Sequence, residues 1–355
     1  MSTSEVDPAK LEEFMGRAVV DMGAAISAPL FVIGERLGLY RAMADGGPMT
    51  STEVAEKAGV AERSVREWLR NQAAGGYVVY DPEADTYELP PEQAMALADP
   101  ESPVYLLGAF DLIASLYADE DKILAAFESG EGMGWHEHDR RLFAGTERFF
   151  RPGYKGHLVA EWIPALEGVE QKLAAGAKVA DVGCGHGAST VLMAEAFPES
   201  EFHGFDYHQA SIDRARDAAA AAGVGDRVDF EVAMAKDYPG EDYDLVAVFD
   251  CLHDMGDPVG ASAHIHETLG PDGTWMVVEP FAGDSVVDNL NPVGRIFYGA
   301  STMICTPASL DQEVGLALGA QAGEARLAEV IKEGGFSSVR RATETPFNLI
   351  LEAKP

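Results

Sequence analysis

The sequence predicts an α/β protein with a doubly wound, mostly parallel sheet of seven strands in its C-terminal half and a small separate domain before it. Two observations support this prediction. From about residue 158 onward, short apolar runs alternate with helical stretches, which is typical of a parallel sheet covered by helices on both faces. Residues 50–89 instead show two short helices followed by two short strands around a polar turn.

The C-terminal pattern supplies the elements of the sheet in turn. The candidate strands are residues 178–182, 201–206, 228–232, 244–250, 274–279, 338–343 and 347–352, and the candidate helices are 189–196, 211–222, 261–269 and 325–333. Only residues 344–346 separate the last two strands, and so short a link cannot make a parallel crossover. The last strand is therefore predicted to run antiparallel.

Three regions are expected along the chain: residues 1–99, 100–157 and 158–355. In the first, a helix that begins at Thr50, a second helix over 62–73 and a hairpin of strands 77–80 and 86–89 form the pattern of a winged-helix domain. Residues 24–39 carry apolar side chains at helical spacing together with Glu35 and Arg36, which favours a buried helix over a membrane span. Residues 100–157 are rich in aromatic side chains, and we expect a helical connector that also serves as a lid.

Charge and cysteine content exclude several classes of function. The chain has 59 acidic and 26 basic residues, and its net charge of −33 repels nucleic acid and anionic membrane surfaces. Glutamates alternate with the arginines of the 62–73 helix, so no basic face is expected there. The sequence shows no signal peptide, disulfide framework or paired-cysteine metal motif, so we expect a cytoplasmic protein without a metal site. The acidity indicates either a solubilising surface or adaptation to high salt.

A glycine-rich turn follows the first strand of the predicted sheet. Residues 179–187 read VADVGCGHG, an apolar strand that ends in glycines before a helix begins. Glycines let the backbone approach a ligand closely, and such turns lie at the carboxyl ends of strands, where ligands bind in doubly wound sheets. The same residues satisfy the G-x-G-x-x-A dinucleotide pattern through Gly183, Gly185 and Ala188, which leaves a nicotinamide cofactor as an alternative.

Acidic residues close the following strands. Asp206 ends the second strand, 23 residues after Gly183 (206 − 183 = 23), where a carboxylate can accept both ribose hydroxyl hydrogens. A later apolar strand brings Asp250, Cys251, His253 and Asp254 to the same edge of the sheet, and another ends in Glu279. Together with the glycine-rich turn, the chain thus carries four successive motifs, which read DVGCGHG, FHGFD, DLVAVFDCLHD and LGPDGTWMVVEP.

As a set, these motifs resemble those of class I S-adenosylmethionine (SAM)-dependent methyltransferases, a Rossmann-like fold with a reversed last strand. The resemblance covers roughly residues 158–355. The winged-helix region is similar to that of bacterial and plant small-molecule O-methyltransferases, in which it mediates dimerisation and helps to close the substrate pocket. The resemblance therefore implies a methyltransferase that binds SAM, forms a homodimer and acts on a small, apolar or aromatic acceptor.

The resemblance also implies roles for individual residues. The cofactor would contact Asp181, Gly183, Cys184, Gly185, Gly187, Asp206, Tyr207, Ala235, Asp250 and Cys251. Glycines 183, 185 and 187 would lie against its amino-acid end, Asp206 would bind the ribose and Tyr207 would lie beside the adenine. Many relatives carry an acid where Met234 stands, so adenine recognition here would use backbone groups or Asp237 instead.

The segment LHDMGD, residues 252–257, resembles a stretch of O-methyltransferases in which the histidine is the general base. His253 is accordingly the candidate base, oriented by a carboxylate such as Asp254 or Glu279. An ordinary imidazole pKa of about 6.5 suits removal of a hydroxyl proton near neutral pH. Two rival functions remain open at this point: a nicotinamide-dependent oxidoreductase, and a SAM-sensing winged-helix regulator.

Overall fold

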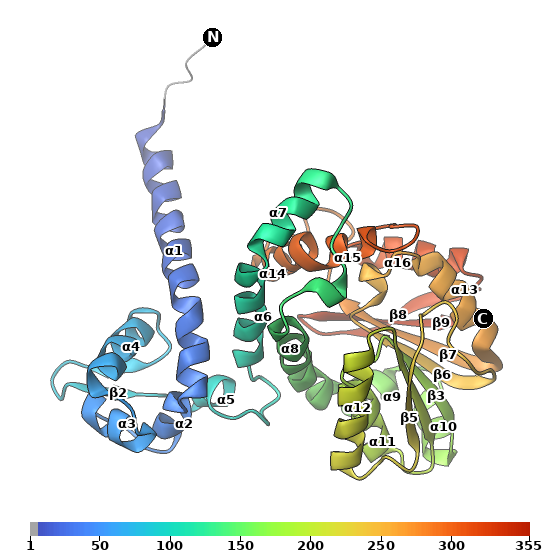
Figure 1. Ribbon diagram of the computed structural model, residues 1–355, viewed down its shortest axis with the longest axis horizontal. Helices are drawn as coiled ribbons and strands as arrows, with labels where there is room; N and C mark the ends of the chain where they lie inside the picture. The colour runs from blue at the N-terminus through green and yellow to red at the C-terminus, as the bar shows by residue number, and fades with distance from the viewer. Residues whose placement is uncertain (1–5) are drawn as a thin grey trace. The chain divides into compact units, whose positions relative to one another are not determined.

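The computed structural model describes residues 6–355 (Figure 1), which form two compact units. One unit comprises residues up to 114 together with 144–152, and the other comprises 115–143 together with 153–355. The expected connector, 100–157, is thus shared between the two units. Residues 1–5, on which the expectation of no signal peptide partly depends, lie outside the described residues.

The N-terminal unit is a helical bundle with one small hairpin. Its elements are α1 (Pro8–Arg36), α2 (Leu39–Ala44), α3 (Ser51–Ala58), α4 (Glu62–Ala74), β1 (Val79–Asp81), β2 (Thr86–Glu88), α5 (Pro91–Leu97), most of α6 (Leu107–Ala118) and the middle of α8 (Arg141–His157). Helix α3 begins with a capping box between Thr50 and Glu53, which explains why the predicted start is so well defined. Strands β1 and β2 pair antiparallel, as predicted for the hairpin.

Trp68 of α4 organises the core of this unit. Its indole Nε1 donates a hydrogen bond to the Leu30 carbonyl at 2.9 Å, and its ring packs edge-on against Tyr40, whose hydroxyl donates to Gln72 at 2.8 Å. Gly34 of α1 makes this approach possible, because a Cβ there would lie 2.6 Å from the Trp68 ring. The C-terminal third of α1 is thereby fixed to α4.

The arginines of α4 are paired within their own helix. Arg63 and Arg70 form ion pairs with Glu67, and Arg66 pairs with Glu62. The glutamates that alternate with them in sequence therefore neutralise them in space. This arrangement weakens the case for a phosphate-binding face on α4.

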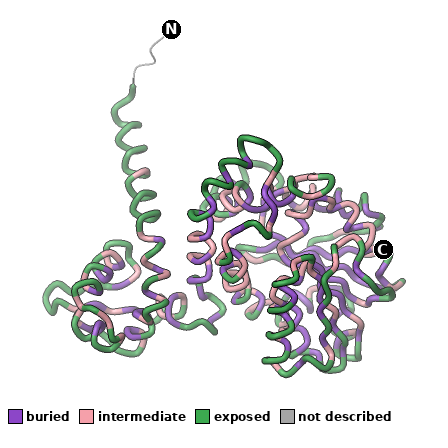
Figure 2. Tube along the Cα trace, in the orientation of Figure 1, coloured by how far each residue is buried: buried purple, intermediate pink, exposed green. Residues whose placement is uncertain are grey.

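Helix α1 corrects the prediction of a buried helix over residues 24–39. It begins at Pro8 and ends at Arg36, and its buried residues are only Ala28, Phe31 and Gly34. Figure 2 shows the rest of the helix as mostly exposed. The apolar spacing did predict a helix, but most of the apolar side chains face away from the core of this unit. Length and a mean hydropathy of 1.5 make α1 the one helix among residues 6–355 that could cross a membrane, a test that core helices and signal sequences also pass.

The C-terminal unit contains the predicted seven-stranded sheet in the order β5-β4-β3-β6-β7-β9-β8. Its strands are β3 (Lys178–Val182), β4 (Glu201–Asp206), β5 (Val228–Val232), β6 (Tyr243–Phe249), β7 (Leu269–Pro280), β8 (Ser338–Glu344) and β9 (Asn348–Lys354). All run parallel except β9, which pairs antiparallel with both β7 and β8. The reversed last strand was predicted from its short connection.

Helices cover both faces of this sheet (Figure 1). The helical elements of this unit are α7 (Glu120–Ser129), η1 (Trp135–Glu137), the ends of α8, η2 (Leu158–Trp162), α9 (Ile163–Ala165), α10 (Val169–Ala175), α11 (Ala188–Ala196), α12 (Gln209–Ala222), η3 (Leu252–Asp254), α13 (Pro258–Thr268), α14 (Pro292–Ala300), η4 (Ser301–Cys305), α15 (Thr306–Leu310) and α16 (Gly323–Glu333), of which α10, α11, α12, α13 and α16 contact the strands. Alternate residues of β6 such as Val246 and Val248 pack with Ile265 of α13 and Leu327 of α16 in one core.

The contact between Gly34 and Trp68 makes a prediction about stability. We expect Gly34→Ala to lower the thermal midpoint of unfolding, at a cost of about 1–3 kcal/mol for overpacking. The matched control is Gly23→Ala on the same helix, where a new Cβ meets nothing within 4 Å. That change should be neutral or stabilising by up to about 1 kcal/mol. Equal midpoints for the two variants would show that the Trp68 contact is not tight.

Candidate active site

The candidate site lies at the carboxyl ends of β3, β4, β6 and β7. Successive connections leave β3 in opposite directions, toward β4 and later toward β6, and ligands bind at such a switch point in doubly wound sheets. The two sides of the switch point touch: Cys251, after β6, places its Sγ 3.4 Å from the Val182 carbonyl of β3. A Cβ on Gly183 would lie 2.6 Å from the same sulfur.

The glycine-rich loop has the backbone that its sequence predicts. Gly183, Gly185 and Gly187 have φ angles of +76°, +52° and +77°, in the region that favours glycine. A Cβ on Gly187 would lie 2.8 Å from the Phe230 ring, whereas one on Gly185 would meet nothing within 4 Å. The middle of the loop therefore presents open space to a ligand, and its end is packed against the sheet.

Asp206 at the end of β4 faces this loop. Its Oδ2 accepts a hydrogen bond from the Gly185 backbone N–H at 3.0 Å, and its Oδ1 accepts from the His208 N–H at 2.8 Å. Burial raises the pKa of this carboxyl, although these two hydrogen bonds oppose the shift. The carboxylate is thus fixed against the glycine-rich loop at the carboxyl end of β4.

Asp181 is fully buried beneath the loop. Its Oδ2 accepts hydrogen bonds from the hydroxyls of Ser189 and Thr190, both at 2.6 Å, and its Oδ1 has no partner among the described residues. Burial raises its pKa to about 6. Sequence reasoning missed the two hydroxyl residues, although their position at the start of the following helix was a usable signal.

Asp250 follows β6 in a strained conformation. Its φ of +51° is unusual for a residue with a side chain. Its carboxylate accepts hydrogen bonds from the Tyr154 hydroxyl at 2.7 Å and from the Asn348 amide at 3.0 Å. Burial, and then the charge of Glu279, raise its pKa to about 8. No pattern in the sequence indicated Tyr154 or Asn348 as partners of Asp250.

His253 lies on the short helix η3 and is only 4% exposed. Its Nδ1 donates to Glu279 Oε2 at 2.5 Å, and the Leu252 backbone N–H donates to the other oxygen of the same carboxylate at 2.9 Å. Burial opposes the charged imidazole, but the charges of Glu279 and Cys305 and the hydrogen bonds to both together raise the pKa of His253 above its ordinary value of 6.5. Glu279, rather than Asp254, contacts the ring.

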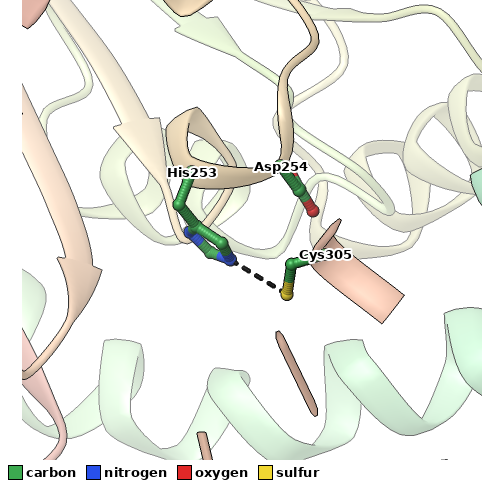
Figure 3. A group of neighbouring side chains, drawn as sticks. All are labelled: His253, Asp254 and Cys305. Carbon is green, nitrogen blue, oxygen red and sulfur yellow. Dashed lines mark hydrogen bonds between the residues drawn. The ribbon is translucent and has the colours of Figure 1, made fainter. Parts of the chain in front are cut away.

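Two further groups surround the other ring nitrogen. Cys305 Sγ lies 3.3 Å from His253 Nε2, and the Asp254 carboxylate lies close by (Figure 3). Burial raises the pKa of Asp254 to about 7 and also raises that of the Cys305 thiol. Cys305 ends η4, a π-helical turn between α14 and α15, and such turns are frequent at functional sites.

The remaining predicted residues lie along the same edge. Cys184 is buried, whereas Tyr207 is exposed. Ala235 is partly buried against the core. The Asp237 carboxylate accepts a hydrogen bond from the Met234 backbone N–H at 3.1 Å, so the polar group near Met234 is already engaged.

The site fits a cofactor that carries positive charge. Asp181, Asp206, Asp250, Asp254 and Glu279 all lie at one edge, and burial raises the pKa of the four aspartates. Ionising such a group is costly without a nearby cation. SAM offers a sulfonium and an ammonium group, and the open space at Gly185 allows backbone contact.

Comparison with known proteins identifies both parts of the chain. Residues 24–99 match the model of an Rv2258c-like winged HTH domain, and residues 173–317 match that of a methyltransferase domain. The chain therefore joins a winged helix-turn-helix domain to a methyltransferase domain, as the sequence motifs predicted. S-adenosylmethionine is the cofactor of this class of methyltransferase.

Curated relatives share the methyltransferase region. The chain is 31% identical over 143 residues to 27-O-demethylrifamycin SV methyltransferase of Amycolatopsis mediterranei, covering 40% of this chain and 44% of that protein. It is 32% identical over 128 residues to trans-aconitate 2-methyltransferase of Streptomyces coelicolor, covering 36% and 42%. The chain thus spans less than half the length of these relatives.

Solved structures share the whole fold. Mitomycin 7-O-methyltransferase superposes with a TM-score of 0.67 at 19% identity, covering 98% of this chain and 100% of that one. Human N-acetylserotonin methyltransferase with bound SAM gives 0.68 at 15%, covering 100% and 99%. An O-methyltransferase from neocarzinostatin biosynthesis, bound to SAM and 2-hydroxy-5-methyl naphthoic acid, gives 0.60 at 19%, covering 92% and 95%. These likenesses confirm the predicted fold class.

The pairing of His253 with Glu279 makes a prediction about titration. In Glu279→Gln the neighbouring negative charge is lost, so the pKa of His253 should fall from above 6.5 toward or below that value. The measurement is a pH titration of isotope-labelled histidine rings by NMR, with His253 assigned from its loss in His253→Ala. His264 and His266 on α13 serve as internal controls and should not shift. An unchanged His253 titration would exclude Glu279 as the cause.

Proposed function

We propose that this chain transfers a methyl group from SAM to an oxygen atom of a small, apolar or aromatic acceptor, with His253 as the general base. The observation that carries the proposal is the His253–Glu279 pair, which lies at the sheet edge where the glycine-rich loop and Asp206 meet. A base and a cofactor cradle at one edge are the two parts that such a reaction requires.

The cofactor residues have distinct tasks. Asp206 is placed to accept hydrogen bonds from ribose hydroxyls, and Gly183, Gly185 and Gly187 to lie against the amino-acid end. Asp250 and Cys251 border the methionine portion, Tyr207 and Ala235 the adenine, and Cys184 packs beneath the loop. Asp181 stabilises the loop through Ser189 and Thr190 at the start of α11. When bound, SAM supplies a methyl group already activated by its positive sulfur.

The protein's own chemistry is proton removal. His253 Nε2 takes the proton of the acceptor hydroxyl while Glu279, on Nδ1, fixes the ring and stabilises the imidazolium that forms. Because the pKa of His253 is raised, the neutral, active form is less abundant at neutral pH than for an ordinary histidine, and its fraction increases toward mildly alkaline pH. Asp254 lies on the Nε2 side, where it can orient the acceptor hydroxyl.

The charge of the site narrows the acceptor class. Five carboxyl groups and one imidazole line this edge, so an acceptor that is itself an anion would be repelled. A neutral phenol or alcohol is therefore favoured over a carboxylate such as the aconitate in the name of the Streptomyces relative. The same carboxylates disfavour the rival nicotinamide cofactor, whose pyrophosphate would have to lie beside them.

The rival role as a DNA-binding regulator is disfavoured by α4. Its arginines pair with glutamates of the same helix, and the chain carries a net charge of −33. A gel shift with random duplex DNA should therefore show no complex at physiological salt. The three free cysteines favour a reducing compartment, and we place the protein in the cytoplasm.

Calorimetric titration with S-adenosylhomocysteine (SAH) tests the cofactor site. We expect Asp206→Ala to weaken binding about ten- to a hundredfold through loss of charge-assisted hydrogen bonds. Asp229→Ala on the neighbouring β5 is the control and should bind normally.

His253→Ala should also bind SAH normally, yet lower methyl transfer to a panel of phenols and alcohols by about 10²–10⁴-fold. Normal transfer in His253→Ala would exclude the base; absence of SAH binding in the unaltered chain would exclude the whole proposal.

We further propose that the chain forms a homodimer through α1. Exposed apolar residues form a stripe along one side of this helix, where they recur at spacings of three, four and seven. The six residues of this α1 stripe are Leu11, Met15, Val19, Met22, Ile26 and Ile33. The residues that α1 buries in its own unit, Phe31 among them, lie on the opposite side. A second copy of the same stripe can cover this face, whereas the unit itself cannot.

The α1 stripe continues into an apolar groove between α1 and α4. A cavity of about 740 Å³ lies between the end of α1 and the start of α4, and Leu30, Ile33, Leu37, Val60 and Trp68 line part of it. Ile33 belongs to both the stripe and the groove. The apolar surface is therefore continuous from the exposed helix into the bundle, as an interface with the α1 of a partner would require.

Adjacent valines on α1 provide a matched test of this interface. Val19→Glu places a charge within the stripe and should convert a dimer into a species of 37.9 kDa. Val20→Glu adds the same charge on another side of the helix, where the dimer should tolerate it. Sedimentation velocity measures both masses. A monomeric unaltered chain, or equal effects of the two changes, would contradict the proposal.

A further inference from the structure

Three potential metal ligands surround one point beside the candidate base. They are His253 Nε2, the Asp254 carboxylate and Cys305 Sγ, and the three ligand atoms all lie within 4.8 Å of one another (Figure 3). They come from η3 and from the π-helical turn η4, 52 residues apart in sequence. His253 and Cys305 are buried and Asp254 is partly buried, so this is not an exposed acidic cluster.

We propose that these three side chains form a binding site for a zinc-type divalent cation, and that the bound ion takes His253 Nε2 away from proton transfer. The site itself does not depend on the methyltransferase activity; only the consequence for catalysis rests on the proposed function. It departs from the expectation of no metal, which was based on the lack of any local cysteine motif in the sequence.

The distances suit this ion. With Zn–N of about 2.0–2.1 Å and Zn–S of about 2.3 Å, a tetrahedral site separates its nitrogen and sulfur by about 3.5 Å. His253 Nε2 and Cys305 Sγ are already 3.3 Å apart. The Asp254 oxygen already lies within 4.8 Å of the other two ligand atoms, and a zinc site would place it about 3.5 Å from them, so a shift of about 1 Å completes the three-ligand set. The fourth position stays available to water.

The surroundings favour a cation in this position. Glu279 accepts a hydrogen bond from His253 Nδ1, the arrangement that fixes a metal-binding histidine with its other nitrogen free to ligate. Glu279 is itself anchored by the Leu252 backbone N–H, so the ring cannot turn away easily. One sulfur, one imidazole and one carboxylate select zinc over magnesium or calcium, which prefer oxygen ligands.

Metal binding and base function exclude each other. A general base needs the lone pair of Nε2 to accept the acceptor's proton, and a metal ion at Nε2 uses the same lone pair. Binding replaces protons: the Cys305 thiol loses its proton to solvent as the S–Zn bond forms, and His253 binds in its neutral form. No electron is transferred, and affinity should increase with pH.

Cobalt(II) provides a direct readout of the site, because a cobalt–thiolate bond produces a charge-transfer absorption in the near ultraviolet. We expect this absorption when Co²⁺ is added to the reduced chain of residues 1–355, and we expect one equivalent of Zn²⁺ to abolish it. Cys305→Ser should abolish it as well. Cys251→Ser, which removes a thiol at the same sheet edge but outside the cluster, should retain it, and normal SAH binding by Cys305→Ser would show that this variant is folded.

The effect of bound zinc on His253 can be measured without following methyl transfer. In the NMR titration of histidine rings, one equivalent of Zn²⁺ should make the His253 signals independent of pH near neutrality, and excess EDTA should restore their titration. No cobalt–thiolate absorption in the unaltered chain, or its persistence in Cys305→Ser, would overturn the site. A His253 that still titrates with zinc bound would overturn the effect on the base. Neither arm requires methyl transfer, so failure of the proposed activity would not be mistaken for failure of the metal site.

Discussion

Burial of negative charge at one edge of the sheet is the constraint on which the rest of the site depends. Four aspartates with raised pKa values and Glu279 lie at the ends of β3, β4, β6 and β7. The protein stabilises them with fixed donors: backbone N–H groups for Asp206 and Glu279, hydroxyls for Asp181 and an amide for Asp250. Such an edge is stable with part of its charge protonated, and a cationic ligand changes that balance. This explains why a sulfonium cofactor and a metal ion are both reasonable occupants of neighbouring positions.

Segments from outside the central strands complete the site. Tyr154, at the end of α8, and Asn348, at the start of β9, bind the two oxygens of Asp250 from positions 96 and 98 residues away. The π-helical turn η4 similarly brings Cys305 to His253. Asp250 keeps its strained backbone because these contacts and the strand pairing fix it from several sides. The reversed strand β9 therefore contributes to the site as well as to the sheet.

The sequence predicted the parts of this structure that depend on local patterns. The bounds of β3, β4 and β5 agree with the apolar runs, because each buried strand shows its periodicity within a few residues. Asp206, Asp250 and Glu279 were found for a related reason: each lies at or next to the carboxyl end of a parallel strand, and these ends meet at the same edge of the sheet. Cys305 was not found, since no local rule relates it to His253 across 52 residues. For α1, spacing predicted a helix but could not tell which neighbour covers its apolar side, and the prediction of burial was wrong for most of its length.

In the proposed dimer, the negative surface charge of the two copies opposes association, whereas burial of the apolar α1 stripe favours it. Two copies that each carry a net charge of −33 repel one another, so any association must come from apolar burial that outweighs this repulsion. Salt screens the repulsion over about 8–10 Å and leaves the apolar contribution in place. The same screening relieves the self-repulsion of a single copy. The hypothesis of adaptation to high salt and the proposed dimer through α1 are thus linked physically, because screening by salt would favour both the association of two copies and the folding of each.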